Sequence, residues 1–178
     1  MLDLAIINRM NRGEFAALFG PVFENSPWVA ERAWEKRPFD TVTALHTAML
    51  GEIRAMDRKA KVDFLHAHPD LAGREAKEGT MTAESVEEQG TAGLDRLSPD
   101  EVATIDGFNR AYRERHGFPF VVCVRHYTKL GIFAEFEARL ARDSEAELAE
   151  ALRQIGHISR YRLEALLRKP RQQVAEPA

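Results

Sequence analysis

A chain of 178 residues is long enough to bury a hydrophobic core. Its single cysteine, Cys123, excludes an intrachain disulfide and fits a reducing compartment such as the cytoplasm. Apolar residues make up 44% and charged residues 30% of the chain, as in an ordinary globular protein. The formal net charge of -3 argues against nucleic-acid binding, and no apolar run approaches the roughly 18 residues that span a membrane.

Helices are predicted along almost the whole chain, because apolar residues recur every three or four positions and capping residues or prolines mark the ends of these segments. The predicted helices are residues 11–19, a segment with Ser26 as its cap and Pro27 at its first position, a segment capped by Asp40 that runs to Met56, and residues 57–67, 82–92, 98–117, 128–141 and 144–168. Two of them begin with a predicted capping box, formed by Ser98 with Glu101 and by Ser144 with Glu147.

The segment Gly117–Val124 departs from the helical pattern. It is apolar and rich in β-branched and aromatic residues, as a buried strand would be, but no other segment offers a partner strand. We therefore predict an extended segment that crosses between helices. The expected fold is all-α, a single compact bundle-like domain of about eight helices over residues 1–169, followed by a flexible C-terminal tail at 170–178.

The last predicted helix carries one charged residue on its apolar face. The residues of this face are spaced by four and three positions and are Leu148, Leu152, Ile155, Ser159, Arg162 and Leu166. Arg162 therefore projects from the buried side, where an unpaired guanidinium costs several kcal/mol. It is either a structural cation, at the edge of the core or in an ion pair, or a cation that faces an internal cavity and accepts an anion. Spacing alone leaves both open.

Two histidines, His66 and His68, lie near the end of the predicted helix 57–67 and precede Pro69 and Asp70. A His-x-His pair followed by an acid is one pattern of a metal site. Residues two apart on a helix point to different sides, however, so we expect no metal here. His68 is then either a solvated histidine at a helix C-terminus or a proton carrier, since imidazole titrates near neutral pH.

The segment 84–89 is acidic and is predicted to be helical, which places Ser85 and Glu88 on one face. Such a run is commonly a solvated acidic face. The acidic run would have a function if the folded chain brings Glu88 close to His68 and Arg162. The three side chains would then supply a hydrogen-bond partner, a proton carrier and an anchor for an anion.

Four stretches follow one another in an order typical of one enzyme family. They are Phe19–Ala30 (FGPVFENSPWVA), His68–Gly73 (HPDLAG), Ser85–Leu94 (SVEEQGTAGL), and a stretch that runs from Asn109 past Tyr112 into Gly117–Arg125 (GFPFVVCVR). Together they resemble the 2-oxo-4-hydroxy-4-carboxy-5-ureidoimidazoline (OHCU) decarboxylases, the enzymes of the last step from urate to (S)-allantoin. The resemblance spans nearly the whole chain.

The resemblance implies a homodimer that binds a small anionic ureidoimidazoline and needs neither a metal nor an organic cofactor. It assigns catalysis to His68, Glu88 and Arg162. It also implies a substrate pocket, to which Glu88 and Arg162 contribute together with Pro69, Ser85, Phe120, Val121 and Val122.

The implied reaction removes a carboxylate from a carbon next to a ring C=N bond. The electron pair left behind delocalises into that bond, so the substrate is its own electron sink. Asp70 departs from the family's pattern, and its charge bears on the charge state of His68. The residues leave two alternatives: an inactive helical interaction module in which Arg162 is half of a structural ion pair, and a metal-dependent hydrolase that uses His66, His68 and Asp70.

Overall fold

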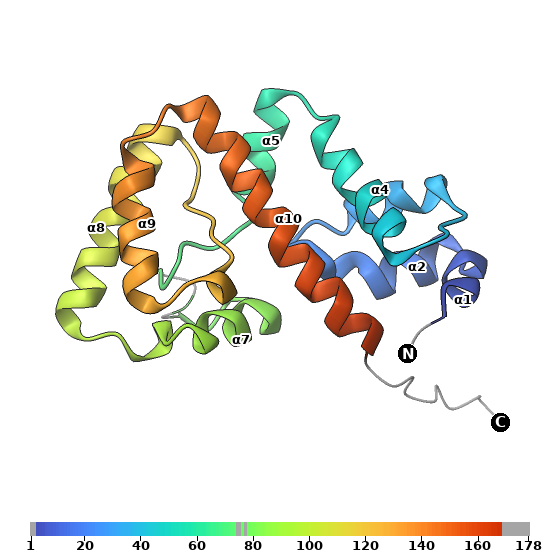
Figure 1. Ribbon diagram of the computed structural model, residues 1–178, viewed down its shortest axis with the longest axis horizontal. Coiled ribbons are helices and arrows are strands. Elements are labelled where there is room, and N and C mark those ends of the chain that lie inside the picture. The colour runs from blue at the N-terminus through green and yellow to red at the C-terminus, as the bar shows by residue number, and fades with distance from the viewer. Residues whose placement is uncertain (1–2, 74–75, 77, 169–178) are drawn as a thin grey trace. The chain divides into compact units, whose positions relative to one another are not determined.

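The computed structural model describes residues 3–73, 76 and 78–168, and the regular structure within them is helical throughout (Figure 1). The predicted all-α fold is therefore confirmed. The chain divides into two compact units, unit 1 with Met1–Ala55 and Ser159–Ala178 and unit 2 with Met56–Ile158. The single domain predicted over residues 1–169 stays a prediction, and the predicted tail at 170–178 lies outside the described residues.

Unit 1 is built from short helices and from the last turns of the longest helix. Its elements are α1 (Leu4–Arg9), α2 (Arg12–Phe19), the 3-10 turns η1 (Gly20–Val22) and η2 (Trp34–Lys36), α3 (Trp28–Ala33), α4 (Val42–Arg54) and residues 159–168 of α10 (Ser144–Arg168). Helix α3 packs against both α2 and α4, and the buried apolar side chains of this unit include Phe15, Leu45 and Met49. The spacing analysis does not predict α1, because six residues are too few to establish a helical period.

Capping differs from the prediction at two helix starts in unit 1. Helix α4 is capped by Thr41, whose side chain accepts the Ala44 N–H at 2.9 Å, and not by Asp40. Helix α3 begins after Pro27 without a side-chain cap, so the capping role predicted for Ser26 is wrong. Both helices nevertheless begin within two residues of the predicted positions, which is the usual uncertainty of a helix boundary.

Unit 2 is built from longer helices around an aromatic core. Its elements are α5 (Arg58–Leu65), α7 (Ala83–Thr91), the 3-10 turns η3 (Leu94–Arg96) and η4 (Val124–His126), α8 (Pro99–His116), α9 (Lys129–Leu140) and residues 144–158 of α10. Helices α8 and α9 lie side by side (Figure 1), where the rings of Phe108 and Phe136 stack with their centroids 5.4 Å apart. Tyr112, Phe118 and Phe120 complete the buried aromatic cluster.

The two predicted capping boxes have different outcomes. At α8 the box of Ser98 and Glu101 is confirmed, with both reciprocal hydrogen bonds present. At α10 the box of Ser144 and Glu147 is wrong, because Asp143 accepts the first backbone N–H groups at 2.9 and 3.2 Å. Glu147 is completely buried instead. Its carboxylate is engaged by partners from other helices, which the local sequence does not reveal.

The segment Phe118–Val124 is buried, and the described part of the chain gives it no partner strand, as predicted. Two side chains take the place of that strand. Arg139 of α9 donates to the Val121 carbonyl at 2.9 Å, and Gln154 of α10 accepts the Cys123 N–H at 2.8 Å. Because buried backbone polar groups need partners, these two side chains allow the extended path through the interior of unit 2.

Candidate active site

His68 lies in a turn directly after α5, not on the helix itself. Its backbone N–H donates to the Leu65 carbonyl at 3.0 Å, and its ring meets the Phe64 ring edge-on with the centroids 5.4 Å apart. The residue is 9% exposed, whereas His66 is exposed to solvent. The two histidines therefore occupy different environments, and the description of His68 as a solvated helix-end residue is wrong.

The loop that follows His68 is held by three side chains from two helices. Gln89 of α7 accepts the Ala72 N–H at 2.9 Å, and Asn109 of α8 donates to the Leu71 carbonyl at 3.0 Å. Arg113 of α8 donates to both carboxylate oxygens of Asp70 at 2.9 and 3.1 Å. The charge of Asp70 is thereby countered, which limits its influence on the neighbouring histidine.

Gly73 is required where this loop turns. A Cβ atom at position 73 would lie 2.6 Å from the Cβ atom of Asp70, which is far inside van der Waals contact. The Gly73 N–H donates to the Asp70 carbonyl at 3.0 Å, and Ala72 has a positive φ of 48°. The backbone from His68 to Gly73 is therefore tightly constrained, as a residue that transfers a proton in a fixed direction requires.

Helix α7 connects the His68 loop with the crossing segment of unit 2. Ser85 and Gln89 are buried on one face, and Glu88 beside them is partly exposed. Burial, with a smaller contribution from the charge of Glu88, raises the pKa of the Cys123 thiol to about 11. Glu88 therefore acts electrostatically on the end of the crossing segment, while the unreactive thiol argues against Cys123 as a nucleophile.

The crossing segment itself offers backbone donors. Arg139 and Gln154 engage the Val121 carbonyl and the Cys123 N–H, but within the described residues no hydrogen bond involves the N–H groups of Val121 and Val122. Both residues are only 5% exposed. Buried backbone donors of this kind are suited to bind a ligand.

Arg162 projects from the buried face of α10, as predicted, and forms an ion pair. Its Nη1 atom lies 2.8 Å from Oε2 of Glu24, and the two side chains are 7% and 1% exposed. Glu24 is held in a tight turn after η1, where Asn25 has a positive φ of 45°. The carboxylate is therefore placed by the backbone of the motif FGPVFENSPWVA, in which it is the single charged residue.

The predicted site residues are distributed over both units. Unit 2 holds His68, Pro69, Ser85, Glu88, Phe120, Val121 and Val122, and unit 1 holds Arg162. Within unit 2, α7 binds the His68 loop through Gln89 and also contacts η4, the 3-10 turn at the end of the crossing segment.

Sequence reasoning misses most of the residues that hold these groups in place. They are Glu24, Gln89, Asn109, Arg113, Arg139, Glu147 and Gln154. Their partners lie in other elements, so no local pattern reveals them. Glu24 is the single carboxylate in an otherwise uncharged motif, and this is the one local signal that could have indicated it.

The structure also bears on the metal alternative. Among the described residues no three histidine, cysteine, aspartate or glutamate side chains gather as a metal ion would require. Asp70 is bound to Arg113, whose Nη1 atom also lies 3.4 Å from Nδ1 of His66. A carboxylate held by a guanidinium is a poor candidate for a metal ligand, which disfavours the proposed His66, His68 and Asp70 set.

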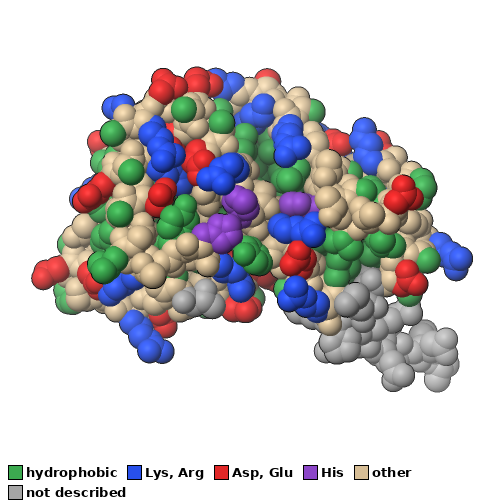
Figure 2. All heavy atoms as spheres, in the orientation of Figure 1, with side chains coloured by type: hydrophobic (Ala, Val, Ile, Leu, Met, Phe, Trp, Pro, Cys, Tyr) green, Lys and Arg blue, Asp and Glu red, His purple; other side chains and the backbone are tan. Residues whose placement is uncertain are grey.

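Charged side chains of both signs lie on the face of the molecule shown in Figure 2. On the face shown in Figure 2, basic and acidic side chains are intermixed, and neither sign forms a continuous stripe. None of the helices in the described part of the chain has the length and apolar character needed to cross a bilayer.

A rigidly held imidazole and buried backbone donors in an all-helical fold are features of an acid–base enzyme that acts on a small molecule. Comparison with known proteins narrows this class. Residues 8–164 match the OHCU decarboxylase family, so the chain belongs to that family.

Individual relatives agree with this assignment. The chain is 39% identical to the 2-oxo-4-hydroxy-4-carboxy-5-ureidoimidazoline decarboxylase of Mus musculus, over 93% of each chain. It is 36% identical to the uric acid degradation bifunctional protein of Bacillus subtilis, over 92% of this chain and 32% of that protein. The crystal structure of (S)-allantoin synthase superposes with a TM-score of 0.74 at 26% identity, covering 93% of this chain and 54% of the other, so this chain spans about half of that one.

Proposed function

We propose that this chain decarboxylates OHCU to (S)-allantoin in urate breakdown. The observation that carries the proposal is the family match over residues 8–164, which includes the constrained His68, Glu88 and Arg162. Relatives that match over nearly the whole chain bear the decarboxylase name, and a bifunctional relative is named for uric acid degradation.

The reaction needs no electron sink from outside the substrate. The bond between the ring carbon and the carboxylate breaks, CO₂ leaves, and the electron pair enters the adjacent C=N bond. The ring nitrogen takes up a proton, which leaves an enol. The hydroxyl of this enol then loses its proton and becomes a carbonyl, and the neighbouring ring carbon takes up a proton, so one proton is consumed overall. The protein has to hold the anion, orient the scissile bond and deliver the proton to one face.

His68 is the group that we assign to proton transfer. The turn after α5, the ring of Phe64 and the constrained backbone up to Gly73 fix its direction. An imidazole can take the hydroxyl proton and return one to carbon at neutral pH. A fixed direction of delivery is what a product of one handedness requires.

Glu88 and the crossing segment are the groups that we assign to substrate orientation. The Glu88 carboxylate accepts a hydrogen bond from the substrate hydroxyl or an N–H group, and Ser85 on the same face assists. The N–H groups of Val121 and Val122, with Phe120 and Pro69 as pocket walls, bind substrate oxygens. Support comes from the burial of Phe120, Val121 and Val122 and from the absence, among the described residues, of hydrogen bonds from the N–H groups of Val121 and Val122.

Arg162 is the group that we assign to the anion. A guanidinium carries five N–H donors, more than one carboxylate can accept, so the ion pair of Arg162 with Glu24 is compatible with binding of an anionic substrate. The same ion pair favours a second candidate function, an inactive helical interaction module in which Arg162 is only structural. Turnover distinguishes the two, because the interaction module predicts none.

We propose further that the protein acts as a homodimer in the cytoplasm and without a metal or organic cofactor. The family resemblance supports the dimer and the cofactor independence, and the single buried cysteine fits a reducing compartment. Light scattering should give twice the 20.1 kDa of one chain. Activity should be unchanged after treatment with a chelator, and a loss that added metal restores would contradict this part of the proposal.

The deciding experiment generates the unstable substrate from urate with the two enzymes that act before this step. Circular dichroism then follows the allantoin that forms with and without this protein. We expect faster formation and a product of one handedness. Allantoin that forms at the spontaneous rate and without handedness would refute the proposed function.

A further inference from the structure

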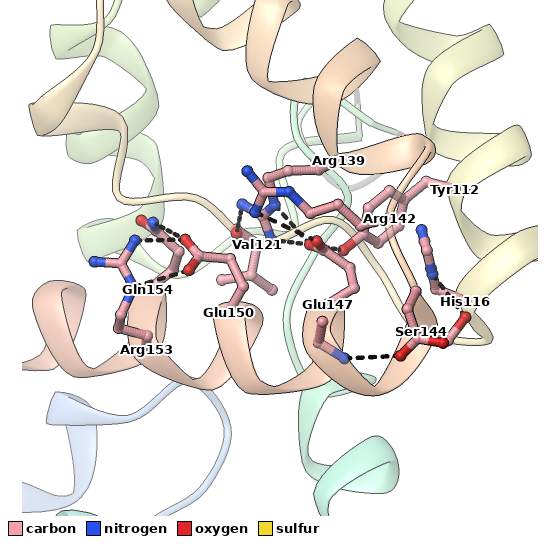
Figure 3. Close-up of polar contacts among 12 residues, drawn as sticks. Tyr112, His116, Val121, Arg139, Arg142, Ser144, Glu147, Glu150, Arg153 and Gln154 are labelled. Atoms are coloured by element: carbon pink, nitrogen blue, oxygen red, sulfur yellow. Dashed lines mark hydrogen bonds and ion pairs between the residues drawn. The ribbon is translucent and has the colours of Figure 1, made fainter.

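A completely buried charge cluster lies behind the crossing segment of unit 2 (Figure 3). Arg139 of α9 and Glu147 of α10 form an ion pair in which both side chains are 0% exposed, and Arg139 Nε donates to Glu147 Oε1 at 2.6 Å. Tyr112 of α8 donates its hydroxyl to the same oxygen at 2.5 Å. Burial first, and then this hydrogen bond, raise the pKa of Tyr112 far above its usual value, so it stays a donor.

The same guanidinium holds two consecutive residues of the crossing segment. Its Nη1 atom donates to the Val121 carbonyl at 2.9 Å, and its central carbon lies 4.4 Å above the ring of Phe120. On its other side, that ring stacks on Phe136 with the centroids 3.7 Å apart. Arg139 therefore fixes both the carbonyl direction and the neighbouring ring, while Glu147 fixes Arg139.

A second side chain fixes the segment two residues further on. Gln154 is 1% exposed, and its Oε1 atom accepts the Cys123 N–H at 2.8 Å. Its amide group donates to Glu150 at 2.6 Å, and Glu150 is in turn paired with Arg153 (Figure 3). The Gln154 amide is thus oriented by its own neighbours, and the Cys123 N–H has a fixed acceptor.

Stability alone does not explain a buried ion pair of this kind. The desolvation of two charges offsets much of their attraction, and an apolar pair of similar volume is often equally stable. The cluster differs from an apolar pair in one respect: it gives the backbone at Val121 a directed hydrogen bond. Its chemistry therefore points to control of backbone geometry.

We propose that Arg139, Glu147 and Gln154 are positioning residues that aim the Val121 and Val122 N–H groups at the substrate. The inference rests on the proposed function. The Val121 carbonyl and the Val122 N–H belong to one planar peptide group, and the Cys123 N–H belongs to the next, so the two fixed points hold both peptide groups that flank the Cα atom of Val122. A displacement of about 1 Å in such a site can cost 10²-fold in rate, so a cluster that touches no substrate atom still controls turnover.

The test removes the cluster without leaving a buried charge. The double variant R139M/E147M exchanges both members for side chains of similar length, and R58M/E145M removes an exposed ion pair of the same unit as a matched control. We expect the first variant to keep its thermal midpoint within a few degrees, to lose at least tenfold in kcat/KM, and to shift the Val121 and Val122 amide resonances in NMR spectra. The control should keep kcat/KM within twofold.

A second variant decides the matter if the double variant does not fold. Q154M removes the acceptor of the Cys123 N–H together with the donor to Glu150, and we expect kcat/KM to fall about fivefold in a folded protein with an unchanged pH profile. Folded variants with unaltered kcat, KM and amide resonances would refute the inference while the active parent protein upholds the proposed function. An inactive parent protein would refute the function itself, so the two failures are distinct.

Discussion

Each unit of the molecule contains one buried arginine–glutamate pair, and α10 contributes to both. In unit 2, Arg139 and Glu147 are both fully buried, and the arginine also binds a backbone carbonyl and an aromatic ring. In unit 1, Arg162 and Glu24 are 7% and 1% exposed. The same two residue types thus occur in two settings: the first arginine is committed to the fold around it, whereas we propose that the second serves an anion.

The contrast teaches that the identity of a buried pair does not reveal its task. What separates the two is the destination of the remaining donors, because a guanidinium has more N–H groups than one carboxylate can accept. Arg139 directs its donors at Glu147 and Val121. If Arg162 directs donors at substrate, a change at this residue will lower turnover directly. Loss of Glu147 alone will lower stability, because it leaves a buried charge, and the Arg139 pair will affect turnover only through the positions of Val121 and Val122.

The largest expected effect is on stability, from Glu147→Leu. This change leaves the Arg139 guanidinium buried without its counter-charge, which costs about 3–5 kcal/mol in comparable cases. Urea unfolding measures the free energy of unfolding, and R139M/E147M is the control, because it leaves no lone charge and should recover most of the loss. A loss below about 1 kcal/mol for Glu147→Leu would show that water reaches the cluster.

The second largest expected effect is a loss of stability of unit 1 in acid. In this unit the ring of His46 is hydrogen-bonded to the hydroxyl of Ser159 on α10, with a distance of 2.9 Å between Nε2 and Oγ. Burial first, and then the charge of Arg160, lower the pKa of His46 to about 4. Between pH 6.5 and about 4, His46 is neutral in the folded protein but takes up a proton in the unfolded chain. The free energy of unfolding therefore falls as the pH drops from about 6.5 to 4 and then levels off. The expected loss is about 3 kcal/mol at pH 4.

Unfolding measured between pH 4 and 7 tests this expectation, with His46→Gln as the control. The amide keeps a hydrogen-bonding group toward Ser159 but does not titrate, so the part of the pH dependence that is due to His46 should disappear. Equal pH dependence in both proteins would show that other groups set the acid sensitivity of unit 1.

The sequence predicts those parts of the fold that depend on neighbouring residues. The capping box of Ser98 and Glu101 lies within one turn and is correct. The extended path of Gly117–Val124 follows from an apolar run that no strand can pair. The position of Arg162 on the buried face of α10 follows from the three- and four-residue spacing of the apolar residues along that helix.

The parts that the sequence does not predict depend on residues far apart in the chain. Glu147 has the spacing of a capping residue, but Arg139 and Tyr112 from two other helices engage its carboxylate. Glu24 is 138 positions from Arg162, so only the folded chain reveals that pair. The catalytic assignment of His68 came from resemblance to a family, whereas the structure supplies the constrained loop that supports it.

The change Arg162→Lys tests, through turnover, whether the buried arginine of unit 1 serves the substrate. A compact ammonium group cannot reproduce the planar fork of a guanidinium, and loss of a donor aimed at developing negative charge costs about 10²-fold. We expect kcat/KM to fall by that factor while the protein stays folded, because a charge remains opposite Glu24. Arg160→Lys on the same helix, where Arg160 is 37% exposed, should keep kcat/KM within twofold. Normal kinetics for Arg162→Lys would show that the pair of Arg162 with Glu24 is structural and has no part in turnover.

The smallest and most discriminating effect is expected from Glu24→Gln. The amide retains an oxygen for Arg162 but removes the negative charge, so the site gains net positive charge while the guanidinium is less firmly oriented. We therefore expect kcat to fall about tenfold without a rise in KM, the profile of a group that acts mainly in the transition state. Glu31→Gln, an exposed carboxylate of α3 that lies 3.9 Å from Arg12, should change neither constant. A folded Glu24→Gln protein that loses stability and keeps kcat would mean that the pair of Glu24 with Arg162 is structural, because the orientation of Arg162 would then have no bearing on turnover.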